Sequence, residues 1–139
     1  MPQPLTYATL LRDCGLARID AQILFQHATG LGRAWLIAHD QDEVEPEHAR
    51  IFGALAARRR AGEPVAYIVG VREFFGRDFR VTQDVLIPRP ETELLVELAL
   101  ARAPQNGRVL DLGCGSGCIP VTLQLERPDL AVTAVDVSA

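Results

Sequence analysis

A glycine-rich segment between two aspartates is the part of this sequence that could hold a small ligand. The segment reads Gly113-Cys114-Gly115-Ser116-Gly117; Asp111 lies two residues before it, and Asp136 lies 19 residues after Gly117. Glycines at alternate positions let the backbone approach a ligand closely, and the first N–H groups of the helix predicted to follow can bind a polar group. An acid at the end of the next strand can reach ribose hydroxyls. The spacing therefore predicts a cofactor site.

Three interpretations of this glycine segment compete. A dinucleotide site prefers the pattern G-x-G-x-x-G around a pyrophosphate, which the anion Asp111 would repel. A Walker-type phosphate loop requires a Gly-Lys-Ser/Thr sequence, and none follows here. The third interpretation is a turn that only joins a strand to a helix. An acid attracts a sulfonium or an ammonium group, so the charge pattern favours S-adenosylmethionine, which has no phosphates.

The elements that position this site can be predicted from helix and turn signals. Up to about residue 70 the sequence predicts short helices: Thr6 caps the first, Asp20 caps the second, Trp35 lies in a third, and Pro46 begins a fourth. After Gly62 the pattern changes. An apolar segment up to Gly70 precedes aromatic residues on both sides of Gly76-Arg77-Asp78, which predicts a hairpin turning there. Pro88-Arg89-Pro90 then predicts a stiff, irregular segment.

A strand, a helix and a second strand surround the glycine segment. The sequence predicts a helix from Thr92 to near Pro104, a strand at 108–112, a helix ending before Pro128 and a strand at 131–136. Such a unit implies two parallel strands with a right-handed crossover. Parallel sheets are normally covered on both faces, so one crossover helix should leave apolar side chains partly exposed on the two strands, namely Leu110, Leu112, Val132 and Val135.

The predicted fold class is therefore α/β, in three parts. Residues 1–71 form a helical N-terminal domain, residues 72–90 form a hairpin and Pro-rich linker, and residues 91–139 form the start of a Rossmann-like domain. A formal net charge of −4 argues against nucleic acid and membrane surfaces as partners. The first four residues lack the features of a signal peptide, so a cytoplasmic protein is expected.

The remaining reactive side chains are interpreted as structural. The three cysteines, Cys14, Cys114 and Cys118, have no zinc-site spacing and are expected to be buried and reduced, and no metal is expected. The histidines are expected at the surface or as caps, at positions His27, His39 and His48. Arg58-Arg59-Arg60 are expected to be solvated cations at a helix C-terminus, where the dipole favours them.

Several segments together resemble one family of enzymes. Val109 to Gly117 is similar to the first cofactor motif of class I methyltransferases, and residues 134–138 resemble the strand that follows it. Upstream, residues 62–70, Arg72-Glu73-Phe74-Phe75-Gly76 and residues 85–93 are similar to the release factor glutamine methyltransferases. The order of these segments is highly specific for that family, and the resemblance covers the whole chain.

The resemblance implies a function and a set of site residues. The family uses S-adenosylmethionine to methylate the glutamine side-chain amide in the Gly-Gly-Gln motif of peptide chain release factors. By position, Gly113, Cys114, Gly115, Ser116 and Gly117 would contact the methionine end of the cofactor, and Asp136 its ribose. Arg89, Glu91 and Thr92 would lie beside the active site. A monomer acting on a release factor, without direct nucleic-acid binding, is implied.

One family motif does not occur in these residues. The Asn-Pro-Pro-Tyr motif, which holds the glutamine amide in the family, is absent from the 139 residues. The sequence therefore assigns no catalytic residue, and the chain is interpreted as truncated after the first cofactor motifs and inactive alone. The alternative is a non-catalytic helical module that binds release factors.

Overall fold

A computed structural model describes residues 4–138 of the chain. The chain divides into two compact units, residues 1–69 and residues 70–139. The hairpin belongs to the second unit, whereas the sequence assigned it to a separate linker. Residues 1–3 begin the first predicted part and residue 139 ends the third, and these residues lie outside the described range. The division into three parts remains a prediction.

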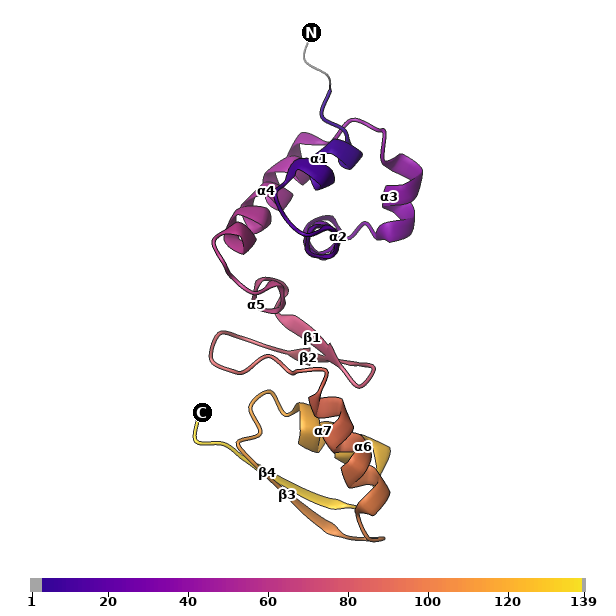
Figure 1. Ribbon diagram of the computed structural model, residues 1–139, viewed down its shortest axis with the longest axis vertical. Helices are drawn as coiled ribbons and strands as arrows, with labels where there is room; N and C mark the ends of the chain where they lie inside the picture. Colours follow the sequence, from indigo (N-terminus) through magenta and orange to yellow (C-terminus); the bar gives the residue numbers. More distant parts are fainter. Residues whose placement is uncertain (1–3, 139) are drawn as a thin grey trace. The chain divides into compact units, whose positions relative to one another are not determined.

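The first unit is helical (Figure 1). Its described residues, 4–69, form the helices α1 (Tyr7–Asp13), α2 (Arg18–Thr29), α3 (Arg33–His39), α4 (Pro46–Arg60) and α5 (Val65–Val69). Helix α5 occupies the apolar segment between Gly62 and Gly70, whose conformation the sequence pattern had left open. The described residues of this unit therefore agree with the prediction of a helical N-terminal part.

Helix caps explain where three of these helices begin and end. The Thr6 and Thr9 side chains form a reciprocal capping box at the start of α1. Pro46 occupies the first turn of α4, as predicted. Gly30 ends α2 in the left-handed region, with a φ of 73° that favours glycine.

The predicted cap of α2 is wrong. This helix begins at Arg18 after Ala17, and no side chain caps it. Asp20 lies inside the first turn, where its carboxylate pairs with Arg59 of α4 at 2.8 Å. A tertiary ion pair has therefore taken the side chain that local pattern assigned to a cap.

The core of the helical unit is aromatic, and a half-buried histidine contacts it. Tyr7, Phe25 and Phe52 are buried, and the Tyr7 ring contacts Phe25 and Trp35 edge-on, with centroid distances of 5.6 and 5.0 Å. Trp35 also stacks on His39 at 4.3 Å. His48 was expected at the surface or as a cap, but only 18% of its side chain is exposed, and its Nδ1 is 2.8 Å from the Tyr7 hydroxyl, so it is neither. That prediction is wrong, because the Tyr7 hydroxyl needs a partner inside the core.

The three arginines at the end of α4 each have a partner. Arg58 forms a two-point contact with Glu63, Arg59 pairs with Asp20, and Arg60 donates to the carbonyl of Cys14 at 2.7 Å. They lie in the last turn of the helix, as predicted. The interpretation as solvated cations was incomplete, because two of them join α4 to residues about 40 positions earlier.

The second unit begins with an antiparallel hairpin, β1 (Val71–Phe74) and β2 (Arg77–Arg80). Its turn is Phe75-Gly76, whereas the sequence placed it at 76–78, and Arg77 and Asp78 belong to β2. The error has a physical cause, because Phe75 has a φ of 52°, which bulky residues rarely adopt. Glu93 accepts the Phe75 N–H at 2.8 Å and so supports this conformation.

Two helices cover one face of a small parallel sheet in this unit (Figure 1). The elements are α6 (Thr92–Arg102), β3 (Arg108–Leu112), α7 (Cys118–Glu126) and β4 (Ala131–Val135), with β3 and β4 parallel as predicted. Phe74, Phe79, Val96 and Leu123 form the core. On the uncovered face Leu110 and Leu112 are 60% and 72% exposed, as expected. The fold is α/β, with part of a Rossmann-like arrangement.

All three cysteines are free thiols, but only Cys118 is buried. Cys14 and Cys114 are half-buried, so the prediction of three buried cysteines is wrong for these two. Among residues 4–138, no helix is both long enough and apolar enough to span a membrane.

Candidate functional site

The pairing of β3 with β4 brings the glycine segment and Asp136 to the same edge of the sheet. Leu112 lies opposite Val135 in the parallel register, so both strands end at that edge. The N–H groups of Gly113 and Cys114 both donate to the Val135 carbonyl, at 2.8 and 3.2 Å. The turn is therefore attached to the end of β4, immediately before Asp136.

The backbone of the turn requires glycine at three positions. Gly113, Gly115 and Gly117 have φ values of 79°, 53° and 81°, all in the left-handed region. A Cβ added to Gly113 or Gly115 would meet nothing within 4 Å. Conformation, rather than crowding by neighbouring residues, therefore demands glycine here, and the backbone at both positions is open to a ligand.

Asp136 is connected directly to the turn. Its carboxylate accepts the N–H of Gly115 at 2.8 Å and the N–H of Ser138 at 2.9 Å. The N–H groups of Ser138 and Gly115 hold the pKa of the Asp136 carboxyl below its usual value. The side chain is exposed, and a carboxylate has about four lone-pair sites, so it can accept further hydrogen bonds.

Two polar side-chain atoms of the second unit are buried without a hydrogen bond from any described residue. They are Oδ2 of Asp111 and Oγ1 of Thr122. The alternation of side chains along β3 puts Asp111 with Val109 on the face that the helices cover. Thr122 is fully buried in α7. The sequence indicated Asp111 through its charge, whereas a threonine inside a helix gives no such signal.

Cys118 is the first residue of α7 and directly follows the turn. Burial raises the pKa of the Cys118 thiol, and a hydrogen bond with Ser116 opposes this effect. The thiol is therefore neutral at physiological pH and is poorly suited to act as a nucleophile. Cys114 lies in the turn itself and is half-buried.

These residues fit S-adenosylmethionine chemically. The open glycine backbone leaves room for the methionine end, and the unpartnered Oδ2 of Asp111 supplies a negative charge of the kind that an ammonium or sulfonium group attracts. Asp136 retains acceptor capacity for hydroxyl groups. The unpartnered Asp111 carboxylate would repel a phosphate group.

The three predicted neighbours of the active site lie at the start of another helix. Glu91 precedes α6 as its N-cap residue, Thr92 is its first residue, and the Thr92 N–H donates to the Arg89 carbonyl at 3.1 Å. Helices α6 and α7 pack against each other. Among residues 4–138, no hydrogen bond or ion pair links these three residues to the glycine turn, so their role remains a prediction.

Two family models match the chain. The PrmC N-terminal domain matches residues 6–70, and the methyltransferase small domain matches residues 90–139. The first covers the helical unit, and the second covers α6 and the glycine turn with its two strands.

Curated relatives match over most of this chain. A release factor glutamine methyltransferase of Bordetella pertussis is 55% identical over 94% of this chain and 49% of its own length. The proteins of the same name from Neisseria gonorrhoeae and Escherichia coli are 54% and 48% identical, over 88% and 86% of this chain and 45% and 43% of their own. The chain therefore spans about half the length of the curated relatives it matches.

Proposed function

Because the chain belongs to the release factor glutamine methyltransferase family, we propose that it contributes the cofactor site for N5-methylation of the glutamine in the Gly-Gly-Gln motif of peptide chain release factors. The bond between Asp136 and the Gly115 N–H carries this proposal on the structural side. This hydrogen bond joins the acid that follows β4 to the open glycine turn that follows the neighbouring strand β3. The names of the relatives support the identity of the substrate.

The three parts of the chain would divide the work. Residues 1–71 bind the protein substrate, residues 72–90 join the two ends of the chain, and residues 91–139 bind the cofactor. Gly113, Cys114, Gly115, Ser116 and Gly117 hold the methionine end, and Asp136 holds the ribose hydroxyls. Arg89, Glu91 and Thr92 line the approach to the reacting groups.

S-adenosylmethionine, held by residues 113–117 and Asp136, would supply an electrophilic methyl group for the glutamine amide nitrogen. The residues of this chain contribute by orientation, because holding the donor in line with the acceptor lowers much of the barrier to such a reaction. The Asp136 carboxylate fixes Gly115, and the Val135 carbonyl fixes Gly113 and Cys114, so the backbone of the turn is held in one conformation beside the strand ends.

The test uses a completed enzyme, made by following these 139 residues with the C-terminal half of the Bordetella relative. We expect transfer of label from methyl-labelled S-adenosylmethionine to the Gly-Gly-Gln glutamine of a purified bacterial release factor. A release factor with that glutamine changed to alanine is the matched control and should remain unlabelled. Label at another residue, or no transfer by a folded enzyme that binds the cofactor, would contradict the proposal.

A further inference from the structure

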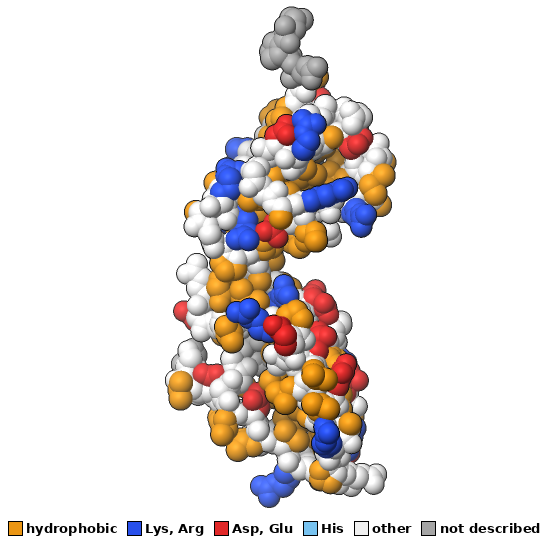
Figure 2. Space-filling view, viewed as in Figure 1, with side chains coloured by type: hydrophobic (Ala, Val, Ile, Leu, Met, Phe, Trp, Pro, Cys, Tyr) orange, Lys and Arg blue, Asp and Glu red, His pale blue; other side chains and the backbone are white. Residues whose placement is uncertain are grey.

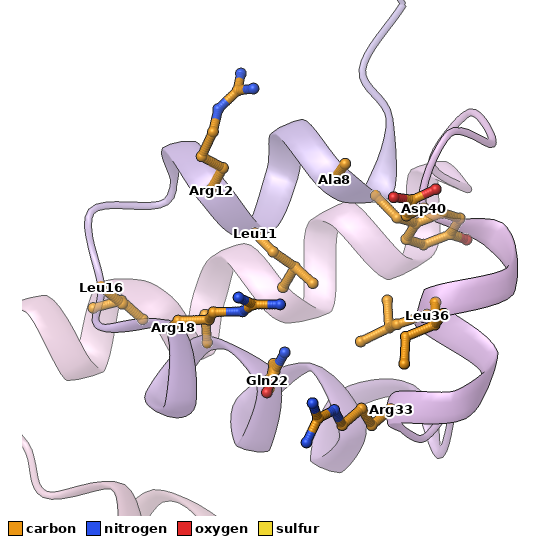
Figure 3. A pocket seen from close by; sticks show the side chains of 12 residues that line it. Ala8, Leu11, Arg12, Leu16, Arg18, Gln22, Arg33, Leu36 and Asp40 are labelled. Atoms are coloured by element: carbon orange, nitrogen blue, oxygen red, sulfur yellow. The ribbon is translucent and has the colours of Figure 1, made fainter.

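The helical unit contains a cavity of about 440 Å³ between α1, α2 and α3. Figure 3 shows Leu11 projecting into it from α1 and Leu36 from α3. Its apolar lining consists of Tyr7, Ala8, Leu11, Leu16, Ala21, Leu36 and Ile37. Cavities of this size can take a small ligand or a large side chain, and Ile37 at the edge is 69% exposed.

Basic side chains surround this apolar lining. Arg12, Arg18 and Arg33 line the cavity together with a single acid, Asp40. Figure 3 shows Arg18, Gln22 and Arg33 along one side of the cavity, with Asp40 at the opposite end from Arg18. On the helical unit, Figure 2 likewise shows basic side chains beside hydrophobic surface.

Two of these arginines have their charge available. Arg12 is neutralised by Asp13, whose carboxylate it contacts at 2.7 Å. Within the described range of residues 4–138, neither Arg18 nor Arg33 forms an ion pair. The edge of the cavity is therefore positive, although the chain as a whole has a formal net charge of −4.

The positions of Arg18 and Arg33 are not those that helix stability would select. Each is the first residue of its helix, at the positive end of the helix dipole, where an acid is preferred. Helices α4 and α6 follow that preference, with Glu47 and Glu93 in their first turns. The acid in the first turn of α2, Asp20, faces Arg59 instead. Local folding therefore gives no reason for a cation at both positions.

We propose that this cavity is a docking site for a segment of the release factor that presents an apolar side chain next to a carboxylate. The apolar side chain fills the space between Leu11 and Leu36. The carboxylate accepts hydrogen bonds from Arg18 and Arg33, whose planar guanidinium groups suit two-point binding of carboxylates, and Gln22 adds an amide donor. The identity of the partner rests on the proposed function, in which a release factor is the substrate.

A protein segment suits this cavity better than nucleic acid does. The apolar lining has room for an aliphatic or aromatic side chain, whereas bound nucleic acid needs an extended basic track along its phosphates. The acids Asp13 and Asp40 interrupt any such track here. Docking at this cavity adds affinity without touching the reacting atoms, so its loss should raise KM for the release factor rather than change kcat.

The first experiment measures binding of a purified bacterial release factor to the 139-residue chain by calorimetry. The double variant Arg18→Gln/Arg33→Gln should bind at least tenfold more weakly, and its affinity should depend less on salt because two exposed charges are gone. Arg50→Gln is the matched control, since Arg50 is an exposed arginine of the same unit that pairs with Glu47 and does not line the cavity. It should bind within twofold of the parent chain.

The outcomes separate docking from methylation. Equal binding by the parent and the double variant, with unchanged circular dichroism, overturns the docking site. Absence of binding by the parent chain also overturns it. So does tighter binding of a single-stranded RNA oligonucleotide than of the release factor. In the completed enzyme, the double variant should raise KM for the release factor at least fivefold. Label transfer that is the same in both leaves the proposed function intact and overturns docking. Weakened binding by the double variant without any label transfer supports docking and contradicts the proposed reaction.

Discussion

The carboxylate of Asp136 already accepts a hydrogen bond from the turn when no ligand is bound. It accepts hydrogen bonds from the N–H groups of Gly115 and Ser138, so it stabilises the conformation of the loop that we propose binds the cofactor. A substitution there should act in two ways, by removing an acceptor for the ribose and by releasing the backbone of the turn. Sequence reasoning predicted the first role from spacing. It could not predict the second, because the bond to Gly115 exists only once β3 and β4 have paired.

We expect Asp136→Ala to weaken the binding of S-adenosylmethionine by the completed enzyme at least tenfold. Hydrogen bonds to a charged group contribute about 1.5–3 kcal/mol each, and at least one is lost. Calorimetric titration measures the affinity. Asp136→Asn is the control, because it keeps one acceptor oxygen and should lose less. Equal affinity for the alanine variant and the parent would remove Asp136 from the site.

The same carboxylate should make the turn sensitive to acid. Because the pKa of Asp136 is lowered on folding, its stabilising contribution is present above the usual aspartate value of about 3.9 and is lost as the pH falls through the lowered value. The amide proton of Gly115 should therefore shift upfield in NMR spectra below about pH 4. The amide of Gly53, which lies in the interior of α4, serves as the reference. A shift of the Gly115 amide centred well above pH 4 would contradict the hydrogen bond.

The helices of the first unit can be tested through two glycines whose contacts are alike and whose conformations differ. Gly30 ends α2 with a φ of 73°, whereas Gly53 lies inside α4, and a Cβ at either position would meet nothing within 4 Å. Gly30→Ala should destabilise the unit by about 1 kcal/mol, since alanine is strained in the left-handed region. Gly53→Ala should stabilise it by about 1 kcal/mol, since alanine favours the helix interior.

Urea unfolding of both variants, followed by circular dichroism, checks the two signs. Changes of the same sign would show that packing rather than backbone conformation controls these positions.

Elements whose ends depend on local signals could be predicted from the sequence. Thr6, Pro46 and the strands on either side of the glycine turn lie where the pattern placed them. The errors have a common cause in contacts between distant residues. The Asp20 carboxylate pairs with Arg59 and does not cap its helix, and a hydrogen bond to Glu93 supports the unusual conformation of Phe75. Of the site, the sequence indicated the turn and both aspartates, but the bond from Gly115 to Asp136 depends on the pairing of β3 with β4.

At the scale of the whole molecule, the helical unit has the features of a domain that folds independently. Residues 1–69 have their own aromatic core, with Phe25 and Phe52 almost fully buried. They should fold without the rest of the chain, although a domain of this size has a small core. A fragment ending at Val69 should give a helical circular dichroism spectrum and a cooperative thermal transition. A spectrum without helical minima would contradict the prediction.

The activity of the 139 residues by themselves is also a property of the whole molecule. The uncovered face of β3 and β4 exposes Leu110, Leu112 and Val135, and an apolar face of this kind favours association. The Asn-Pro-Pro-Tyr motif, which the family resemblance assigns to the glutamine amide, is also absent from these residues. We expect these residues without the relatives' C-terminal half to transfer no label to a release factor. Transfer at the rate of the completed enzyme would show that the acceptor site lies within the chain.

The aromatic core of the helical unit has an optical consequence. Trp35 is the single tryptophan of the chain, and it lies between the Tyr7 edge and the His39 ring. Its fluorescence therefore reports on the helical unit, whereas circular dichroism also records α6 and α7. An unfolding curve recorded by both signals would separate the two units without a label, and a difference between the two midpoints would measure how far the stability of one unit is independent of the other.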